Sequence, residues 1–296
     1  MCGIATSSCS QTGSAGKLSA PDVFVGSTPC DSLSKALLKL PLDTKCEFIR
    51  WDLSLSKGSD SAFALTIIYG EGQPNTTDFK GGGEKRTLKG IYKTTQRGTL
   101  NGAMLQLVAD NASDHISFIK LDDNLYHLLS PDGQLMVGNG GWSYTLSRKE
   151  RQAPGPSLLP ALISSSSLLS DTARRVVFEG RTPCQDLAKA YNLGVDDDCF
   201  KLKWQLVLYR DPVTSLPSRY SLNWTLSRSL PIEGKWTVTR GQGGNRDAVI
   251  YQLHPNQSNP SFSFLAGDRN VLFLLDKAGR LLPGDSNFSY TLNRRQ

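Results

Sequence analysis

The sequence predicts an all-β protein built from two similar antiparallel units in tandem. Three observations support this fold class. A set of motifs occurs twice in the same order, apolar and polar residues alternate within short segments, and turn-forming residues separate those segments. With 296 residues, the chain is long enough for two domains of ordinary size. Many short strands favour a sandwich or a barrel, and a closed barrel of about eight strands would leave no strand edge exposed.

The internal repeat is marked first by cysteine and tryptophan. Each unit opens with Thr-Pro-Cys, continues to a second cysteine and soon reaches a tryptophan. These positions are Cys30, Cys46 and Trp51 in the first unit, and Cys184, Cys199 and Trp204 in the second. Further on, "KGIY" aligns with "EGKW" and "WSYTLSR" with "FSYTLNR", which matches Tyr92 to Trp236 and Trp142 to Phe288. Each unit covers about 120 residues, more than a solenoid repeat, so each should have its own core.

Period-two alternation identifies the strands and their buried faces. In "FKLKWQLVL" one face is apolar and the other carries Lys201, Lys203 and Gln205. The same pattern occurs in "IRWDLSL" and in the closing segments of both units. The side chains expected to point inward are Ile49, Trp51, Leu53, Leu55, Trp142, Tyr144, Leu146, Phe200, Leu202, Trp204, Leu206, Leu208, Phe288, Tyr290 and Leu292.

Each unit has one short segment with a helical pattern, and it lies between the two cysteines. "SLSKALLK" and "DLAKAY" contain helix formers with apolar residues at helical spacing. Asp31 and Thr182 are placed to cap these two helices.

Composition and repeat boundaries divide the chain into four parts. Residues 1–22 are rich in small and polar residues and are interpreted as a flexible tether. Residues 23–149 and 175–296 are the two barrels. Residues 150–174 form a linker rich in Pro and Ser, whose Leu and Ile content predicts that part of it packs against a domain.

The bulk composition excludes several classes of protein. A hydrophobic content of 39% and a charged content of 20% are typical of a globular chain rather than a disordered one. No apolar run approaches the roughly 20 residues of a membrane-spanning helix. The net charge is +6, but Lys and Arg are scattered, so nucleic acid is not expected as a partner.

The two repeated cysteine pairs are interpreted as disulfides, Cys30–Cys46 and Cys184–Cys199. Paired cysteines at similar spacing point to an oxidising compartment. As a Cu(I) or zinc site, each pair would need further ligands, and no His or Met lies near either pair in the sequence. A redox pair would favour Cys-x-x-Cys, which neither pair has. We therefore expect disulfides, with no metal and no cofactor.

The N-terminal segment "MCGIATSSCSQTGSAGK" suggests a lipid anchor. Met-Cys followed by small polar residues fits a lipoprotein whose signal has been removed and to which an initiator Met has been added. Cys2 would then carry the acyl chains, and several chains on one residue would hold the protein at a membrane. Cys9 would be a spare thiol in the tether.

The polar residues do not form a catalytic set. The three histidines are scattered along the chain, and His127 aligns with Phe273, which indicates a packing position. Asp122 and Asp268 recur where hairpin turns are expected, and a carboxylate there can cap the turn. We therefore expect a protein that is not an enzyme.

The repeated aromatic pairs have two interpretations. Large inward-facing rings can fill a small barrel, or they can line a hydrophobic pocket at its mouth. The pairs are Trp51 with Trp204, Tyr92 with Trp236, and Trp142 with Phe288. Their presence in both units favours a framework role over ligand specificity.

The order of "VGSTPC", "IRWDLSL", "KGIY", "NLYHLLSPDGQLM" and "WSYTL", found in related form in both halves, resembles the NlpE-type envelope lipoproteins. This is a copper-resistance and envelope-stress family, and the resemblance is closest to an uncharacterised Bacteroidetes-type branch. It implies lipocalin-like barrels of eight strands, a lipid anchor in the outer membrane, and a sensing or adhesion role. It also raises copper binding. This sequence lacks the family's Cys-x-x-Cys in both halves, so the copper ligands do not carry over.

The function expected from the sequence is therefore that of an exported lipoprotein, tandem-duplicated and anchored to the bacterial outer membrane. It would act as a binding, sensing or structural module, with an envelope protein as partner. Two alternatives remain: a lipocalin-like carrier of a small hydrophobic ligand, and a copper-binding or copper-resistance protein.

Overall fold

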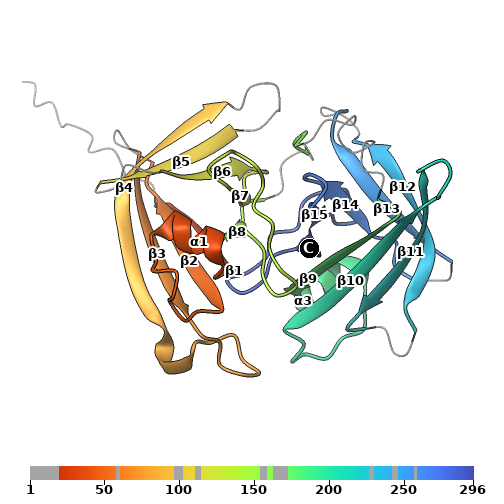
Figure 1. The fold of residues 1–296 in the computed structure, drawn as a ribbon, viewed down its shortest axis with the longest axis horizontal. Helices are drawn as coiled ribbons and strands as arrows, with labels where there is room; N and C mark the ends of the chain where they lie inside the picture. Colours follow the sequence, from red (N-terminus) through yellow and green to blue (C-terminus); the bar gives the residue numbers. More distant parts are fainter. Residues whose placement is uncertain are drawn as a thin grey trace, which may run out of the picture.

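The computed structural model describes residues 20–57, 61–96, 103–110, 115–153, 159–162, 173–226, 230–241, 246–256 and 259–296. It confirms the predicted fold class, because two closed antiparallel barrels of eight strands follow each other along the chain (Figure 1). Each barrel carries one short helix, α1 in the first and α3 in the second. Among these residues, no helix is both long and apolar enough to cross a membrane.

Barrel 1 is formed by strands that pair in chain order, and β8 closes the barrel on β1. Helix α1 follows β1, and a 3-10 turn, η1, precedes β4. The elements are β1 Asp22–Pro29, α1 Ser32–Leu38, β2 Phe48–Leu55, β3 Ala62–Gly70, η1 Lys80–Gly82, β4 Glu84–Gln96, β5 Ala103–Ala109, β6 His115–Lys120, β7 Leu125–Leu129 and β8 Thr145–Arg148.

Barrel 2 repeats this order, and β16 closes it on β9. Helix α3 again follows the first strand. The elements are β9 Arg175–Pro183, α3 Gln185–Tyr191, β10 Lys201–Arg210, β11 Pro217–Trp224, β12 Ile232–Arg240, β13 Val249–Pro255, β14 Ser263–Ala266, β15 Val271–Leu274 and β16 Thr291–Arg294.

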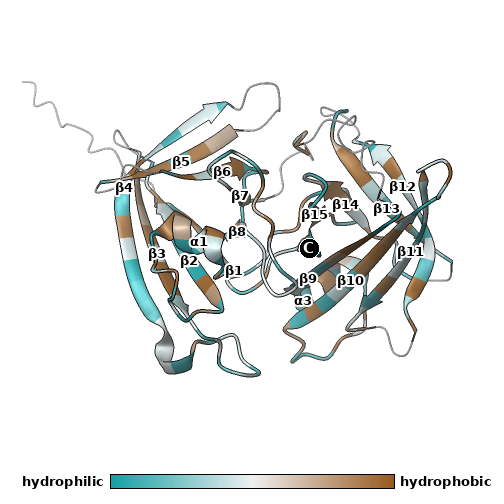
Figure 2. Cartoon of the chain, in the orientation of Figure 1, coloured by the Kyte–Doolittle hydropathy of each residue, from teal (hydrophilic) through white to brown (hydrophobic). Residues whose placement is uncertain are grey.

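Along many of the strands, hydrophobic residues alternate with hydrophilic ones (Figure 2). The hydrophobic side chains that point inward form the core of each barrel. The predicted inward faces of β2 and β10 are buried from Ile49 to Leu55 and from Leu202 to Leu208. The prediction for Phe200 was wrong, because this side chain is 48% exposed. Strand β10 begins to pair with β9 only at Lys201, so Phe200 has no neighbouring strand to hold it inward.

The closing segments differ from the prediction at their first aromatic residue. Tyr144 and Tyr290 lie in the barrel cores as expected. Trp142 precedes β8 and lies outside barrel 1, where its ring stacks on the outward-facing Phe48 at 4.9 Å. Phe288 is buried but also precedes its strand, β16, and it is not part of the core of barrel 2.

The Thr-Pro-Cys motif has a structural explanation in both barrels. The indole N–H of Trp51 donates to the hydroxyl of Thr28, and that of Trp204 donates to Thr182, both at 2.9 Å. A buried indole N–H needs such a partner. The prediction that Thr182 caps the helix was therefore wrong. Asp31 does cap α1, since its carboxylate accepts a hydrogen bond from the amide of Ser34 at 2.9 Å.

The Gly-x-aromatic motif marks a close approach between neighbouring strands. A Cβ added to Gly90 would lie 2.1 Å from the carbonyl oxygen of Val108, and one added to Gly234 would lie 2.0 Å from that of His254. No larger residue fits at either position. The aromatic residue two positions later is buried in barrel 2, where Trp236 donates its indole N–H to the carbonyl of Tyr209.

Both predicted disulfides are present. Cys30–Cys46 and Cys184–Cys199 span 16 and 15 positions, and each bridge encloses the helix of its barrel. Each disulfide therefore ties the loop that carries the helix to the strand on either side of it. Cys2 and Cys9 lie outside the described residues.

The two barrels pack through equivalent outer faces of β6–β8 and β14–β16. A separate apolar cluster joins them and includes Leu159 of the linker, as predicted for part of that segment. Its members occupy matching positions of the repeat: Ile119 and Leu265, Leu125 and Val271, Leu129 and Leu275, Leu135 and Leu281. We call this cluster, with the polar contacts described next, the barrel seam. The seam is pseudo-symmetric, because the same patch is used on both sides.

Hydrogen bonds cross the seam in reciprocal pairs. The amide of Gly138 donates to the side-chain oxygen of Asn293, and the amide of Gly284 donates to the hydroxyl of Ser147, both at 2.8 Å. These four residues are two equivalent pairs of the repeat. At the centre, the hydroxyls of the equivalent residues Thr145 and Thr291 are 2.9 Å apart, as expected for groups on a local two-fold axis.

His127 lies at this centre, and the predicted packing role is confirmed. Its ring is fully buried and meets Phe273 edge to face at 5.3 Å. Nε2 lies 3.0 Å from the carbonyl oxygen of Met136, so Nε2 carries the proton and donates it. Nδ1 then accepts from the hydroxyl of Thr145, at 2.9 Å. Burial lowers the pKa of His127 to about 4, although the Met136 carbonyl acts in the opposite direction.

Removing the second disulfide should weaken barrel 2. For a loop of this length the chain-entropy model gives about 3 kcal/mol, so the Cys184→Ala/Cys199→Ala variant should unfold at a lower urea concentration. The measurement is urea unfolding followed by tryptophan fluorescence. As a control, alkylation of the unlipidated wild type in denaturant without reductant should label Cys2 and Cys9 and leave the four paired cysteines unlabelled. An unchanged unfolding midpoint would contradict the stabilising role.

The buried histidine should make stability depend on pH. Because the pKa of His127 is about 4 in the folded protein against an ordinary value of 6.5, the unfolded chain binds the proton more readily. Its neutral form therefore supports folding fully above the ordinary value, and stability falls as the pH drops from 6.5 towards 4. The loss attributable to this group is about 3 kcal/mol.

Comparison of the wild type with His127→Phe isolates this effect. The variant keeps an aromatic ring, as its counterpart Phe273 does, and should lose the extra acid sensitivity between these pH values. Replacement of the exposed His115 by Gln is the control and should follow the wild type. Identical pH profiles for His127→Phe and the wild type would show that the histidine does not act this way.

Candidate functional site

The clearest difference between the two barrels is a longer hairpin in barrel 1. Leu65 pairs with Leu88 between β3 and β4, and the equivalent pair in barrel 2 is Leu222 with Ile232. Residues 66–87 connect the first pair, and only residues 223–231 connect the second. The added residues extend β3 and β4 and include η1. Both of the large cavities described below lie against this extension.

The first cavity opens where β4 extends beyond β5. Strand β4 pairs with β3 over residues 84–91, but β5 pairs with it only from Gly90 onward. The last bond on that side joins the amide of Asp110 to the carbonyl of Lys89 at 3.1 Å. Figure 1 shows β4 running along the outer side of barrel 1, past the end of the shorter β5. Among the described residues, no strand therefore pairs with the β5 side of β4 before Lys89.

This gap leads into a cavity of about 550 Å³, which we call the β4 opening. Helix α1 bounds it on one side, and the interior faces of β3–β6 form its floor. The apolar lining residues are Leu37, Leu38, Phe63, Leu88, Leu107, Ala109 and Ile116. The volume and the apolar lining are typical of a site for a small molecule.

The same region of barrel 2 is filled by aromatic side chains. Tyr191, at the end of α3, packs against Phe262 at 4.8 Å, and its hydroxyl donates to the carbonyl of Leu275 at 2.6 Å. Phe262 also meets Trp224 at 5.2 Å. The matching residues of barrel 1 are smaller: Leu38, Ile116 and Ile67. Leu38 and Ile116 line the β4 opening, so barrel 1 has smaller side chains at two positions where barrel 2 has the rings of Tyr191 and Phe262.

The rim of the β4 opening is charged. Lys39, Arg86, Lys89, Asp110 and His115 line it. Lys39 follows the last residue of α1 in the left-handed conformation, with φ of 53°, which turns the chain at the mouth of the cavity. Arg86 donates from Nη1 to the carbonyl of Leu38 at 2.7 Å and so fixes the end of the helix beside the opening.

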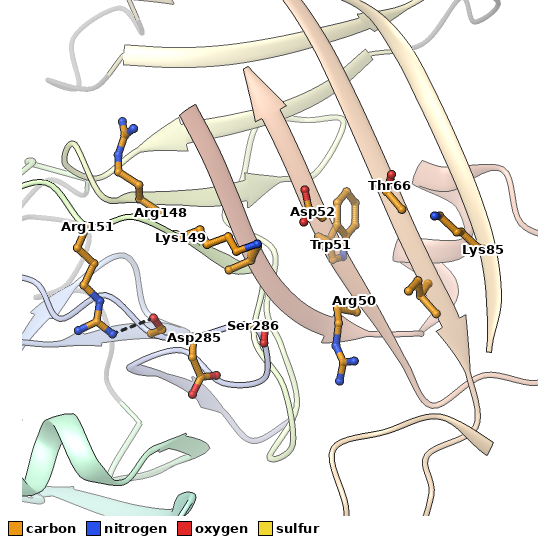
Figure 3. A pocket seen from close by; sticks show the side chains of 13 residues that line it. Arg50, Trp51, Asp52, Thr66, Lys85, Arg148, Lys149, Arg151, Asp285 and Ser286 are labelled. Atoms are coloured by element: carbon orange, nitrogen blue, oxygen red, sulfur yellow. Dashed lines mark hydrogen bonds between the residues drawn. The ribbon is translucent and has the colours of Figure 1, made fainter. Parts of the chain in front are cut away.

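A second cavity, of about 600 Å³, lies on the outer face of the same hairpin, between the two barrels (Figure 3). Its charges are mixed, and several of them hold structural contacts. Arg151 pairs with Asp186 of barrel 2 at 2.6 Å, and Arg50 donates across the junction to Asn287 at 3.0 Å. This cleft belongs to the contact between the barrels, so we do not take it as the binding site.

At the edge of this cleft, an ion pair joins β8 to β1, the two strands whose pairing closes barrel 1. Arg148 of β8 lies 2.5 Å from Asp22 of β1, and Lys57 lies 2.8 Å from the same carboxylate. Burial acts to raise the pKa of Asp22, but the two cations outweigh it and hold the pKa below its ordinary value. The guanidinium of Arg148 also lies over the ring of Phe24, 4.7 Å from its centroid.

The aromatic residues predicted from the repeat mostly serve the framework. Trp51, Trp204 and Trp236 are buried in the barrel cores, and Tyr92 packs against the core of barrel 1 while half-buried. None of the predicted aromatic residues lines the β4 opening. The residues that do form its floor were missed because they are ordinary aliphatic core residues. The ends of the two helices match Leu38 to Tyr191, whereas aligning the first cysteines without a gap places Leu37 opposite Tyr191, so the sequence alone does not give this match.

The remaining polar candidates have structural roles. Asp122 and Asp268 cap their hairpin turns by accepting from the amides of Asn124 and Asn270, each at 2.7 Å, as predicted. Burial raises the pKa of both carboxyl groups. The four paired cysteines are disulfide-bonded and so offer no thiolate in this state. In the part of the chain that the structure describes, no cluster of three His, Cys, Asp or Glu residues is arranged to hold a metal ion.

Comparisons with protein-family models, with curated proteins and with solved structures found no match for this chain.

Proposed function

We propose that this protein is a non-enzymatic, exported binding protein of the cell envelope, whose first barrel takes a small apolar ligand through the β4 opening. Barrel 2 is its structural support. In this proposal Cys2 carries the lipid anchor that holds the protein at the outer membrane. The observation that carries the proposal is the contrast between the open end of barrel 1 and the aromatic-filled end of barrel 2.

The contrast supports binding because empty apolar space is costly. A cavity in a core sacrifices packing contacts and destabilises the fold. Barrel 2 shows that this architecture can fill the same space with Tyr191 and Phe262. A ligand that occupies the β4 opening would restore the missing contacts and would remove its own apolar surface from water.

The two disulfides support export. Disulfides persist in oxidising compartments such as the periplasm and the cell surface. Each barrel has its own disulfide, so the cysteine pairs of both halves are oxidised. The repeated aromatic residues serve the framework in both barrels, so they do not distinguish one barrel from the other. The longer β3–β4 hairpin is present in barrel 1 alone, which agrees with a binding role for that barrel.

Filling the β4 opening should weaken ligand binding. The Leu38→Tyr/Ile116→Phe variant places in barrel 1 the two side chains that barrel 2 already accommodates. The wild type should bind the uncharged fluorophore N-phenyl-naphthylamine at one site per chain. The variant should bind it with a dissociation constant at least about tenfold higher. The measurement is a fluorescence titration of the full chain.

A matched control adds the same kind of bulk outside the barrel. Ile91 lies on β4 and is 44% exposed, so Ile91→Phe should leave the titration unchanged. A thermal melt of each variant checks that it is folded. Equal binding by the wild type and the filled variant would place the fluorophore elsewhere, and failure of the folded wild type to bind it would contradict the proposed function.

A further inference from the structure

We infer that the ligand of the β4 opening is an anionic amphiphile, with an aliphatic chain that enters barrel 1 and a carboxylate or similar anionic group that stays at the rim. This inference rests on the proposed function and adds the chemical class of the ligand. It is carried by the placement of cations around an otherwise apolar cavity.

The floor of the cavity suits an aliphatic chain. Leu38, Leu107 and Ile116 line it with branched aliphatic side chains, and each is at most 8% exposed. They contain no polar atom that a ligand would have to satisfy. A polar group deep in the cavity would lose its bonds to water without replacement, which is unfavourable. The polar end of a ligand must therefore remain at the rim.

The rim has an excess of positive charge. Among the described residues that line the cavity, Lys39, Arg86 and Lys89 carry positive charge and Asp110 is the one carboxylate. Among the described residues, no ion pair joins Arg86 or Lys89 to an acidic side chain. An anion at the mouth would therefore complement the charge there, and a cation would be repelled.

Arg86 is the residue best placed to meet the anion. It points inward from β4 and is half-buried, with one N–H bound to the carbonyl of Leu38. A guanidinium has five N–H donors, so most remain for a ligand. Because the side chain is anchored to α1, little conformational entropy is lost when it binds. Charge-assisted bonds from such a donor are among the stronger hydrogen bonds in proteins.

The open edge of β4 adds backbone donors at the same place. The carbonyl of Lys89 points to the β5 side, where it accepts from Asp110. Backbone groups of every second residue point to the same side of a strand, so the amide of Thr87 also faces the gap, below the last β4–β5 pair at Gly90. Thr87 lines the cavity. An anionic oxygen at the mouth can therefore meet both a guanidinium and a backbone N–H.

The test compares two probes that differ only in charge, dansyl-labelled undecanoic acid and its methyl ester, in fluorescence titrations of the full chain. The wild type should bind the acid at least about tenfold more tightly than the ester. Arg86→Gln/Lys89→Gln should remove most of this preference by weakening only the acid. Raising NaCl from about 0.05 M to about 0.5 M should likewise weaken only the acid.

Two control variants separate charge from fold. Lys93→Gln changes the same charge on β4, at an exposed position outside the cavity, and should leave both titrations unchanged. Arg86→Lys keeps the charge and should retain most of the preference for the acid. A folded Arg86→Gln/Lys89→Gln variant must still bind the ester as the wild type does.

The outcomes distinguish this inference from the proposed function. If the wild type binds acid and ester equally, the apolar site stands and the anion preference is wrong. If it binds the neutral fluorophore but neither dansyl probe, the ligand is not a single-chain amphiphile. If binding is seen only above the concentration at which the acid forms micelles, or only with vesicles of anionic lipid, the protein recognises a charged surface and this inference fails. If no apolar probe binds at all, both proposals fail.

Discussion

The contact between Thr145 and Thr291 marks the constraint on which the arrangement of this molecule depends. Equivalent hydroxyls can meet each other only if equivalent faces of the two barrels are paired, so the seam must follow a local two-fold axis. The reciprocal bonds of Gly138 and Gly284 follow from that geometry, as does the matched apolar cluster around them. Strands β6–β8 and β14–β16 are therefore buried on both faces. The side chains on their outer faces pack against the other barrel, so substitutions there would disturb the contact between the barrels.

The parts of each barrel outside the seam carry no such constraint. The β3–β4 hairpin lies away from the centre of the seam and differs in length between the two halves, and the buried side chains that differ in size include residues of the helix and of β6. Barrel 2 closes its end with Tyr191, Phe262 and Trp224. Barrel 1 has aliphatic residues at the same positions, and its longer β4 leaves a free edge. A duplication thus gives one stable, filled half and one half with space for a ligand.

The Thr–Trp bonds and the disulfides hold the parts of barrel 1 that a cavity would otherwise weaken. Cys30–Cys46 ties the loop carrying α1 to β2, and the indole of Trp51 is bonded to Thr28 beneath it. Arg86 fixes the other end of the helix. These contacts keep α1 in place as one wall of the β4 opening whether or not the cavity is filled. Preorganisation of this kind lowers the entropic cost of binding.

The sequence by itself determined the repeat, the alternating strands, the short helices and the cysteine pairing, because each depends on local periodicity or on the spacing of a few residues. It also identified His127 as a packing residue, through its alignment with Phe273.

The sequence analysis did not reveal that β7 and β15 are buried on their outer faces as well as on their inner faces. The nearly continuous apolar runs "LYHLL" and "VLFLL" carry that signal. Phe200 and Trp142 were misplaced because alternation does not say where a strand stops pairing. Only the tertiary structure decided that Leu38 of α1, Ile116 of β6 and Arg86 of β4 meet at one opening, since these residues are distant in the chain and the closed barrel brings them together.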